Sequence, residues 1–357
     1  MPDIQDEDLP VVAHKPPAAS AGTAIEAAID PDLPIIDPHH HFSSHWGGYF
    51  VEDLRADMQS GHAVAATVYI QCGHAYRADG PEALKPVGET EYVVAQCAAA
   101  GRVGKAGRMD KADRGIAAGI VGHADLRLGE DVDEVLAAHI EAGQGRFRGI
   151  RHSGARHPAF KHGVLSRPPA GLYGDPAFRK GYARLGAHGL SFDAWIYHPQ
   201  IDEVISLAQA FPDIPLILDH VGGVLGVGPY ADDRPRALQE WLPELKRLAA
   251  CPNVRVKLGG LGTATFGFDF SQARRPPDSE MLAALWRPYF EPCLELFGAD
   301  RCMFESNFPV DRSAGSYAVL WNAFKRIAQA ASPDERSALF HGTAAATYRL
   351  APLVAIG

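Results

Sequence analysis

The sequence predicts an α/β fold consisting of a single (β/α)8 barrel with an N-terminal arm. Eight short apolar runs alternate with segments of helical patterning, and no Gly-x-Gly-x-x-Gly motif follows the first run. Strands that alternate with helices pair in parallel, because a parallel neighbour requires a crossover connection. Eight such units favour a closed barrel, and single barrels often exceed 250 residues. The missing glycine motif removes the simplest dinucleotide-binding fold.

Each expected element has a characteristic pattern. The strands are short apolar runs at residues 33–38, 65–72, 117–123, 147–151, 190–197, 214–219, 254–258 and 302–305. The helices have apolar residues at three- and four-residue spacing and are expected at residues 89–100, 131–142, 199–211, 238–248, 281–297 and 317–331. Long connections at residues 73–88, 153–175 and 259–279 are expected to shape a site at the carboxyl ends of the strands.

Residues 1–32 are expected to form the arm, and residues 33–357 the barrel domain. The arm is rich in Ala, Pro and Asp without a sustained period, so we expect it to be mobile or to lie over a neighbouring subunit of a homo-oligomer. The first ten residues lack the features of a signal peptide, and no apolar run approaches the length of a membrane span. Five cysteines without CxxC spacing fit reduced thiols. The sequence therefore predicts a cytoplasmic protein with no membrane partner.

Charge and missing motifs narrow the class of function. The net charge is −9, from 34 basic and 43 acidic residues, which argues against a nucleic-acid partner because phosphate binding needs a basic surface. The sequence contains no Gly-x-Ser-x-Gly elbow and no Walker-type loop. A small molecule is the expected partner.

The segment Ile-Ile-Asp-Pro-His-His-His-Phe at residues 35–42 carries the strongest signal of a site. Side chains alternate along a strand, so Asp37, His39 and His41 are expected to share one side. Two imidazoles at a strand's carboxyl end can converge on one metal ion or one substrate atom, and Asp37 could fix a tautomer. The alternative, an affinity tag, is disfavoured because the run is short, internal and preceded by an apolar strand.

This segment and later strand ends resemble the amidohydrolase superfamily over residues 33–350, particularly its lactonase branch. The family's first-strand His-x-His matches His39 and His41, its fifth-strand histidine matches His198, and its sixth-strand histidine matches His220. The resemblance implies an enzyme that opens a lactone, as 2-pyrone-4,6-dicarboxylate hydrolases and sugar-acid lactonases do. It also implies that His39, His41 and His198 either bind one divalent metal ion, with zinc expected, or act as a metal-independent cluster.

His198 is expected to point into the barrel, with apolar side chains filling the layers beneath it. Those side chains are Phe192, Ala194 and Ile196, while Trp195 is expected to face a helix. A histidine after a strand is also commonly a structural hydrogen-bonding group, and that alternative stays open for His198 and for His220.

The segment after the eighth strand departs from the family's pattern. It reads Phe-Glu-Ser-Asn-Phe-Pro-Val-Asp at residues 304–311, with Asn307 where the family has an aspartate as general base or metal ligand. A neutral amide cannot take a proton from water at pH 7, though its carbonyl can still ligate. Glu305 and Asp311 are the expected sources of a base, and burial would raise the pKa of Glu305. Alternatively, Glu305 pairs with a buried arginine or lysine.

Basic and aromatic residues near the strand ends are candidates for substrate binding. Arg151 ends the fourth strand, where its guanidinium could grip a carboxylate through two hydrogen bonds. Lys257 on the seventh strand could add a point charge. The remaining candidates are His152, Tyr76, Tyr197 and His220. The alternative for each is a surface or helix-facing side chain.

The sequence therefore predicts a hydrolase that opens a lactone carrying a carboxylate or several hydroxyls. A zinc ion would polarise the carbonyl and activate water. Without a metal, imidazolium groups and Arg151 would stabilise the oxyanion. A metal-dependent non-oxidative decarboxylase and a catalytically silent binding barrel stay open as alternatives. Asn307 counts against the decarboxylase and is the feature that suggests the silent barrel.

Overall fold

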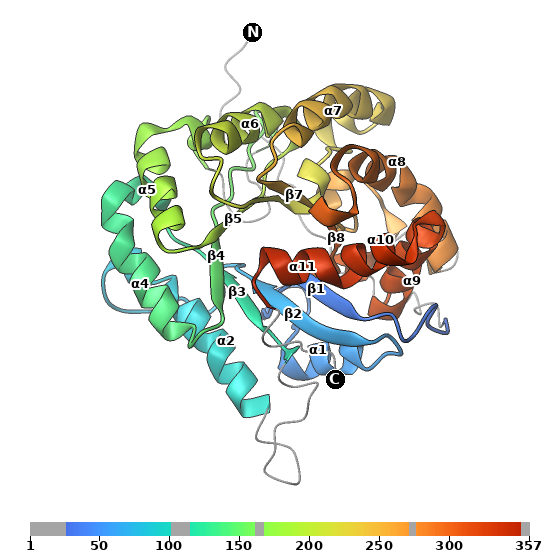
Figure 1. The fold of residues 1–357 in the computed structure, drawn as a ribbon, viewed down its shortest axis with the longest axis horizontal. Coiled ribbons are helices and arrows are strands. Elements are labelled where there is room, and N and C mark those ends of the chain that lie inside the picture. Colours follow the sequence, from blue (N-terminus) through green and yellow to red (C-terminus); the bar gives the residue numbers. More distant parts are fainter. Residues whose placement is uncertain (1–25, 101–114, 161–167, 271–275, 351–357) are drawn as a thin grey trace.

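The computed structural model describes residues 26–100, 115–160, 168–270 and 276–350. Within them, one sheet of eight parallel strands runs in the order β1 to β8, and helices surround it (Figure 1). The strands are β1 Ile35–His40, β2 Val64–Ile70, β3 Gly119–Gly122, β4 Phe147–Arg151, β5 Ser191–Ala194, β6 Leu216–Leu218, β7 Val254–Leu258 and β8 Cys302–Phe304. The helices are α1 Val51–Met58, α2 Val87–Ala100, α4 Val132–Ala142, α5 Pro176–Ala187, α6 Ile201–Ala210, α7 Arg234–Ala249, α8 Ser279–Phe297, α9 Tyr317–Ile327, α10 Pro333–Ser337 and α11 Thr343–Thr347.

The sheet closes on itself where the chain leaves β8 and passes β1. His40 forms a parallel bridge with Phe308, and the backbone N–H of Asn307 donates to the carbonyl of His39 at 2.9 Å. The N–H of His41 donates to the carbonyl of Phe308 at 2.8 Å. The predicted (β/α)8 barrel is confirmed, and each of the eight predicted strands overlaps an observed one.

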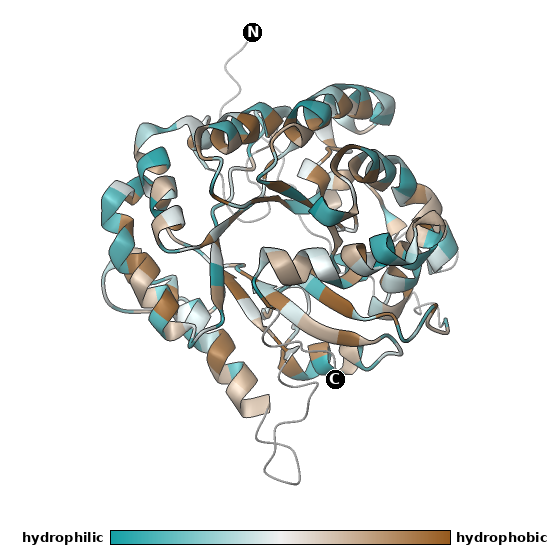
Figure 2. Cartoon of the chain, viewed as in Figure 1, coloured by the Kyte–Doolittle hydropathy of each residue, from teal (hydrophilic) through white to brown (hydrophobic). Residues whose placement is uncertain are grey.

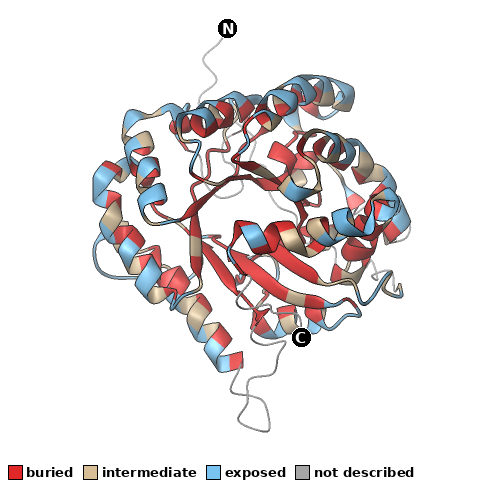
Figure 3. Cartoon of the chain, in the orientation of Figure 1, coloured by how far each residue is buried: buried red, intermediate tan, exposed pale blue. Residues whose placement is uncertain are grey.

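Apolar residues fill two layers, one between the strands and the helices and one inside the barrel. Figure 2 shows apolar residues on the strands and on the inner faces of the helices, and Figure 3 shows that these same parts are buried. The helix α11 crosses one end of the barrel (Figure 1). The inner cluster consists of Ile36, Ala66, Val68, Ile70, Ala118, Val121, Ile217 and Met303 from the strands, with Ala344, Ala345, Tyr348 and Leu350 from the C-terminal segment.

The six predicted helices are present, but α1, α5, α10 and α11 were not predicted. Three of these are short, with five to eight residues, which leaves little room for a hydrophobic period. The longer α5 begins at Pro176 and contains two glycines, which weaken its helical pattern. Asp175 caps it by accepting hydrogen bonds from the backbone N–H groups of Ala177 and Phe178.

Part of the predicted N-terminal arm, residues 1–25, lies outside the described residues. The described part is bound to α9, where the backbone N–H of Ile29 donates to Asn322 Oδ1 at 2.8 Å. Lys325 Nζ donates to the carbonyl of Asp30 at 2.8 Å. In the part of the chain that is described, no helix is long and apolar enough to cross a bilayer.

The pairing of β1 with β2 is irregular between Asp37 and His40, and this reverses the alternation of side chains. Ile36 lies in the inner cluster, whereas the Asp37 carboxylate accepts hydrogen bonds from Ser306 Oγ at 2.6 Å and from the Tyr317 hydroxyl of α9 at 3.0 Å. The prediction that Asp37 shares a side with His39 and holds an imidazole was therefore wrong. Asp37 instead connects β1 to the segment after β8 and to α9.

Candidate active site

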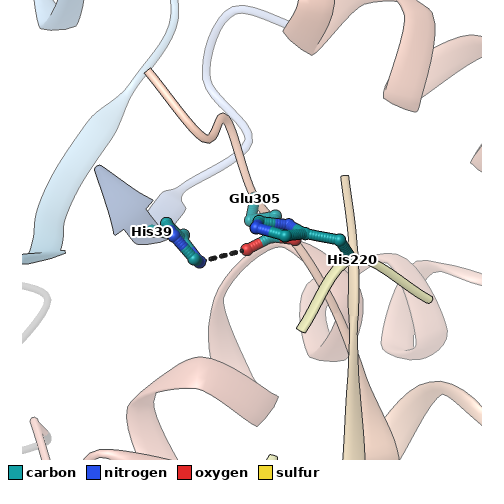
Figure 4. A group of neighbouring side chains, drawn as sticks. All are labelled: His39, His220 and Glu305. Atoms are coloured by element: carbon teal, nitrogen blue, oxygen red, sulfur yellow. Dashed lines mark hydrogen bonds and ion pairs between the residues drawn. The ribbon is translucent and has the colours of Figure 1, made fainter. Parts of the chain in front are cut away.

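His39, His220 and Glu305 meet inside the barrel at the carboxyl ends of β1, β6 and β8 (Figure 4). Glu305 Oε1 lies 2.6 Å from His220 Nδ1, and Glu305 Oε2 lies 2.7 Å from His39 Nδ1. All three side chains are buried. The alternative expectation, that Glu305 pairs with a buried arginine or lysine, is replaced by these two imidazole contacts.

Two glycines after β7 make room for this group. A Cβ on Gly259 would lie 2.4 Å from Glu305 Cγ, and one on Gly260 would lie 2.2 Å from His220 Nδ1. Both distances are too short for a real carbon atom, so only glycine fits at these positions. His220 itself has a φ of +51°, a left-handed conformation that is uncommon for a non-glycine residue and that clusters at functional sites.

His39 and His41 point at each other, with their Nε2 atoms 3.2 Å apart. His41 Nδ1 lies 2.7 Å from the carbonyl of Ile70, so a neutral His41 carries its proton on Nδ1 and keeps a lone pair on Nε2. Burial is the main cause that lowers the pKa of both imidazoles well below the usual value. Both rings are therefore neutral near pH 7. Arg151 Nη1 lies 3.4 Å from His39 Nε2.

A buried cluster of charges adjoins His39. Lys257 Nζ lies 2.6 Å from Asp193 Oδ2, 3.1 Å from Asp219 Oδ1 and 3.2 Å from His39 Nδ1. Burial raises the pKa of Asp193 to about 6, against the opposing attraction of the Lys257 ammonium. Lys257 is fully buried among these partners and lines neither of the two cavities described below, so the geometry does not support its predicted contact with a substrate. Sequence reasoning missed Asp193 and Asp219, although an acidic residue inside an apolar strand is a usable signal.

The structure does not bring His198 to this group. Leu225 N donates to His198 Nδ1 at 3.2 Å, and His198 Nε2 lies 3.8 Å from Glu240 Oε2. The His198 ring packs against Tyr230, with 4.9 Å between ring centroids. The predicted metal set of His39, His41 and His198 is therefore corrected: the group whose ligand atoms lie together consists of His39, His220 and Glu305.

The cause is the orientation of β5. Asp193 points inward to Lys257, while Phe192 packs against Tyr182 of α5 and so faces the helices. The apolar residues expected beneath His198 thus lie on the outer side of the strand. Trp195 was expected under a helix but lines a cavity beside His220, with ring centroids 4.9 Å apart.

Asn307 connects the segment after β8 to Asp311 and Thr263 through hydrogen bonds of its side chain. Its side-chain amide donates to Asp311 Oδ1 at 2.9 Å and to Thr263 Oγ1 at 3.3 Å, and its φ of +51° is a conformation that Asn tolerates. Asp311 folds back into the protein, where burial raises its pKa to about 7. Its Oδ2 accepts the backbone N–H of Gly262 at 3.1 Å.

Two cavities lie beside each other at this end of the barrel. The smaller, of about 20 Å³, is lined by His41, Trp46, Arg151, Trp195, His220, Thr263, Asn307 and Val310. The larger, of about 430 Å³, is lined by Gln71, Cys72, Gly73, Tyr76, His123, Asp125, Arg127, His152, Ser153, Pro168 and Pro169. Arg151, which lines the smaller cavity, contacts Gln71, which lines the larger one: Arg151 Nε donates to Gln71 Oε1 at 3.3 Å, and Nη2 donates to the Gln71 carbonyl.

Four of the predicted substrate-binding residues line one or the other of these two cavities. Arg151 and His220 line the smaller cavity, and His152 and Tyr76 line the larger one. Tyr197 lines neither and is fully buried, with its ring against Phe160 and Trp195. The substrate contact expected of Tyr197 is therefore not supported by the geometry.

The chemistry of the central group fits a divalent metal ion. One ligand atom from each of His39, His220 and Glu305 lies within 4.8 Å of the others. Among the residues that the structure describes, the buried Glu305 Oε2 has no partner with hydrogen-bond geometry, although His39 Nδ1 lies 2.7 Å away. Such a buried carboxylate oxygen is costly unless a cation compensates it. Two imidazole nitrogens and a carboxylate oxygen are ligands that zinc accepts.

Comparison with known proteins agrees with this architecture. Residues 36–350 match the amidohydrolase family model. The uncharacterized protein y4mH of Sinorhizobium fredii is 34% identical over 342 residues, covering 89% of this chain and 99% of that protein. The L-fucono-1,5-lactonase of Burkholderia multivorans is 30% identical over 321 residues, covering 88% of this chain and 96% of the lactonase.

A solved structure extends the comparison. A crystal structure of an amidohydrolase from Burkholderia multivorans with bound zinc has a TM-score of 0.65 and 26% sequence identity, covering 88% of this chain and 99% of that one. The chain therefore belongs to the amidohydrolase family and is an enzyme of its lactonase-like branch.

Proposed function

We propose that the protein is a lactone hydrolase that opens a small cyclic ester by attack of water at the carboxyl end of the barrel. The observation that carries this proposal is that His41, Arg151 and His220 line one cavity, and that His220 also belongs to the His39–His220–Glu305 group. The similarity to a protein named L-fucono-1,5-lactonase supports the reaction class.

The smaller cavity suits the attacking water. Its volume of about 20 Å³ holds a single water molecule, and polar side chains line it. Because Nδ1 is held by the Ile70 carbonyl, the lone pair of His41 lies on Nε2, 3.2 Å from His39 Nε2. His41 Nε2 takes a proton from the attacking water and returns it to the ring oxygen as the bond between that oxygen and the carbonyl carbon breaks. Negative charge that develops on the substrate favours the imidazolium form of His41 and so opposes the effect of burial.

Arg151 stabilises the oxyanion. Its guanidinium lines the same cavity and is fixed by Gln71, so it needs no reorganisation when charge develops on the ester oxygen. His39, His220 and Glu305 would hold a divalent metal ion, which when bound would supply positive charge that polarises the ester carbonyl.

A lactone panel assayed with a pH indicator tests the proposal, since opening a lactone at neutral pH releases a proton. The wild-type protein should hydrolyse at least one lactone. His41→Gln should lower kcat by about 10²- to 10⁴-fold, the usual contribution of a general base, with an unchanged melting temperature. His188→Gln is the matched control, because His188 contacts Asp133 and lines neither cavity.

Two outcomes would contradict the proposal. One is that the wild-type protein opens no lactone, and the other is that His41→Gln retains the wild-type rate. Carbon dioxide release from a phenolic acid, measured in parallel, would favour the decarboxylase alternative. Inactivity in both assays, together with ligand binding, would favour a silent barrel.

A further inference from the structure

We propose that the larger cavity is a subsite for a hydroxyl-bearing part of the substrate, and that His123 and His152 are its specificity-determining pair. The proposal rests on the proposed function, because it places the body of the lactone next to the Arg151 side chain that would face the ester.

Size is the first argument. A cavity of about 20 Å³ cannot contain a ring-sized substrate, whereas about 430 Å³ lies within the usual range for a small-ligand site. Arg151 lines the smaller cavity, and the next residue, His152, lines the larger. Gln71, which accepts a hydrogen bond from Arg151 Nε at 3.3 Å, also lines the larger cavity, so a ring bound there would lie beside the residue that holds the Arg151 guanidinium.

The protonation of the two histidines is the second argument. His123 Nδ1 lies 3.0 Å from the Arg151 carbonyl and must donate to it, which leaves Nε2 as an acceptor. His152 Nδ1 accepts the backbone N–H of Leu126 at 3.4 Å, which leaves the proton on Nε2 as a donor. The two rings are in edge-to-face contact, with centroids 4.9 Å apart. The cavity wall thus presents one acceptor and one donor side by side.

A hydroxyl group matches this pair, because it both donates and accepts a hydrogen bond. Burial keeps both imidazoles neutral, since it lowers the pKa of His152 to about 3 and also lowers that of His123. Tyr76 and Ser153 add hydroxyl groups to the same lining. Each of these four side chains suits an alcohol better than a charged group.

Charge is the third argument, and it disfavours a carboxylate. Arg127 is a cation of this lining, and its Nε and Nη2 donate to the two oxygens of Asp125 at 2.9 and 2.7 Å. Arg151, which lines the smaller cavity, has its Nη1 atom 3.6 Å from Asp219 Oδ2. Both guanidinium groups are thus compensated by protein carboxylates. A carboxylated substrate would have to compete with them, whereas a neutral hydroxylated one would not.

The test compares three lactones that share one ring and differ at one substituent, which is hydroxyl, hydrogen or carboxylate. For the wild-type enzyme, kcat/KM should be about 10- to 100-fold higher for the hydroxylated lactone than for the other two, because a buried polar pair left unmatched is costly. In His152→Phe, which removes the donor, the preference for hydroxyl over hydrogen should fall towards one. His152→Gln, which restores an N–H donor, should recover part of it.

Equal turnover of the three lactones by the wild-type enzyme would overturn the subsite while leaving the lactonase proposal standing. An equal loss on the hydroxylated and deoxy lactones in His152→Phe would also overturn it. His188→Phe is the control for an aromatic substitution outside both cavities, and it should keep the wild-type preference.

A binding measurement separates failure of the subsite from failure of the reaction. The probe is the hydroxylated lactam, in which an amide replaces the ring ester, and calorimetry measures its Kd. Binding to the wild-type protein that weakens about 10-fold or more in His152→Phe supports the subsite even if no lactone is opened. Equal Kd values for the two proteins, or no binding to the wild-type protein, would reject it.

Discussion

Lys257 and Asp193 form an ion pair of 2.6 Å in which both side chains are fully buried inside the barrel. The Tyr348 hydroxyl donates to the same Asp193 oxygen at 2.7 Å, so the C-terminal segment that crosses one end of the barrel also contacts this pair. After burial, the charge of Lys257 is the next largest cause that lowers the pKa of His39. The ion pair thus connects the end of the barrel that the C-terminal segment crosses to the candidate site.

Replacing Lys257 with methionine should be strongly destabilising. The change leaves Asp193 buried without its cation and leaves Asp219 with only the Arg151 guanidinium at 3.6 Å. Breaking a buried pair on one side costs about 3–5 kcal/mol. Urea unfolding of the wild type and Lys257→Met measures the loss. The double variant Lys257→Met, Asp193→Asn should recover part of the stability because it removes one uncompensated charge. A Lys257→Met variant as stable as the wild type would show that the pair is not maintained in solution.

The barrel and the location of its site could be predicted from sequence because both depend on local patterns. Apolar runs mark strands whichever way the side chains point, and the carboxyl ends of parallel strands all lie at one end of a barrel. His39, His41, Arg151, His220 and Glu305 each follow or end such a run, and the structure brings them to one region.

The direction of individual side chains could not be predicted in the same way. A strand of a parallel barrel is buried on both faces, so its apolar pattern does not reveal which face is inside. For this reason Phe192 was expected inside, where Asp193 lies. His198 was expected in the metal set because it matches the fifth-strand histidine of the family that the sequence resembles. The irregularity between Asp37 and His40 contains Pro38, and a proline inside a strand run is a usable sign of a bulge. Pairing the lone charges Asp193 and Lys257 would have given the correct orientation of β5.

Glu305→Gln should weaken metal binding. The amide keeps the size of the side chain but removes the negative charge that faces His39 and His220. After treatment with a chelator, adding zinc should raise the melting temperature of the wild type, with a stabilisation of about 2.7 kcal/mol when free zinc is 100 times Kd. The shift should be clearly smaller for Glu305→Gln.

Glu240→Gln is the matched control for zinc binding, because Glu240 also approaches a histidine, His198, at 3.8 Å. It should respond to zinc as the wild type does. A loss of the response in Glu240→Gln, with a normal response in Glu305→Gln, would move the metal site to the His198 region.

His198→Gln should retain kcat/KM within about threefold of the wild type, whereas His41→Gln should lose about 100-fold or more. The structural reason is that His198 contacts Leu225, Tyr230 and Glu240 rather than the side chains around the smaller cavity. Steady-state kinetics on the best lactone gives the comparison. Equal losses in the two variants would restore His198 to the catalytic group.

Asp311 should make the unfolding free energy depend on pH. Its folded pKa of about 7 lies above the unfolded value of 3.8 because the carboxyl group is buried. Between these values the folded state binds the proton more tightly than the unfolded state, so the contribution of Asp311 to stability is present in acid and is lost as pH rises towards 7.

Asp311→Asn cannot titrate. The difference in unfolding free energy between wild type and Asp311→Asn, measured with urea from pH 4.5 to 7.5, should therefore fall steadily as pH increases. A difference that stays constant or grows over this range would mean that the Asp311 carboxylate is ionised in the folded protein, with its charge stabilised by Asn307 and the backbone of Gly262.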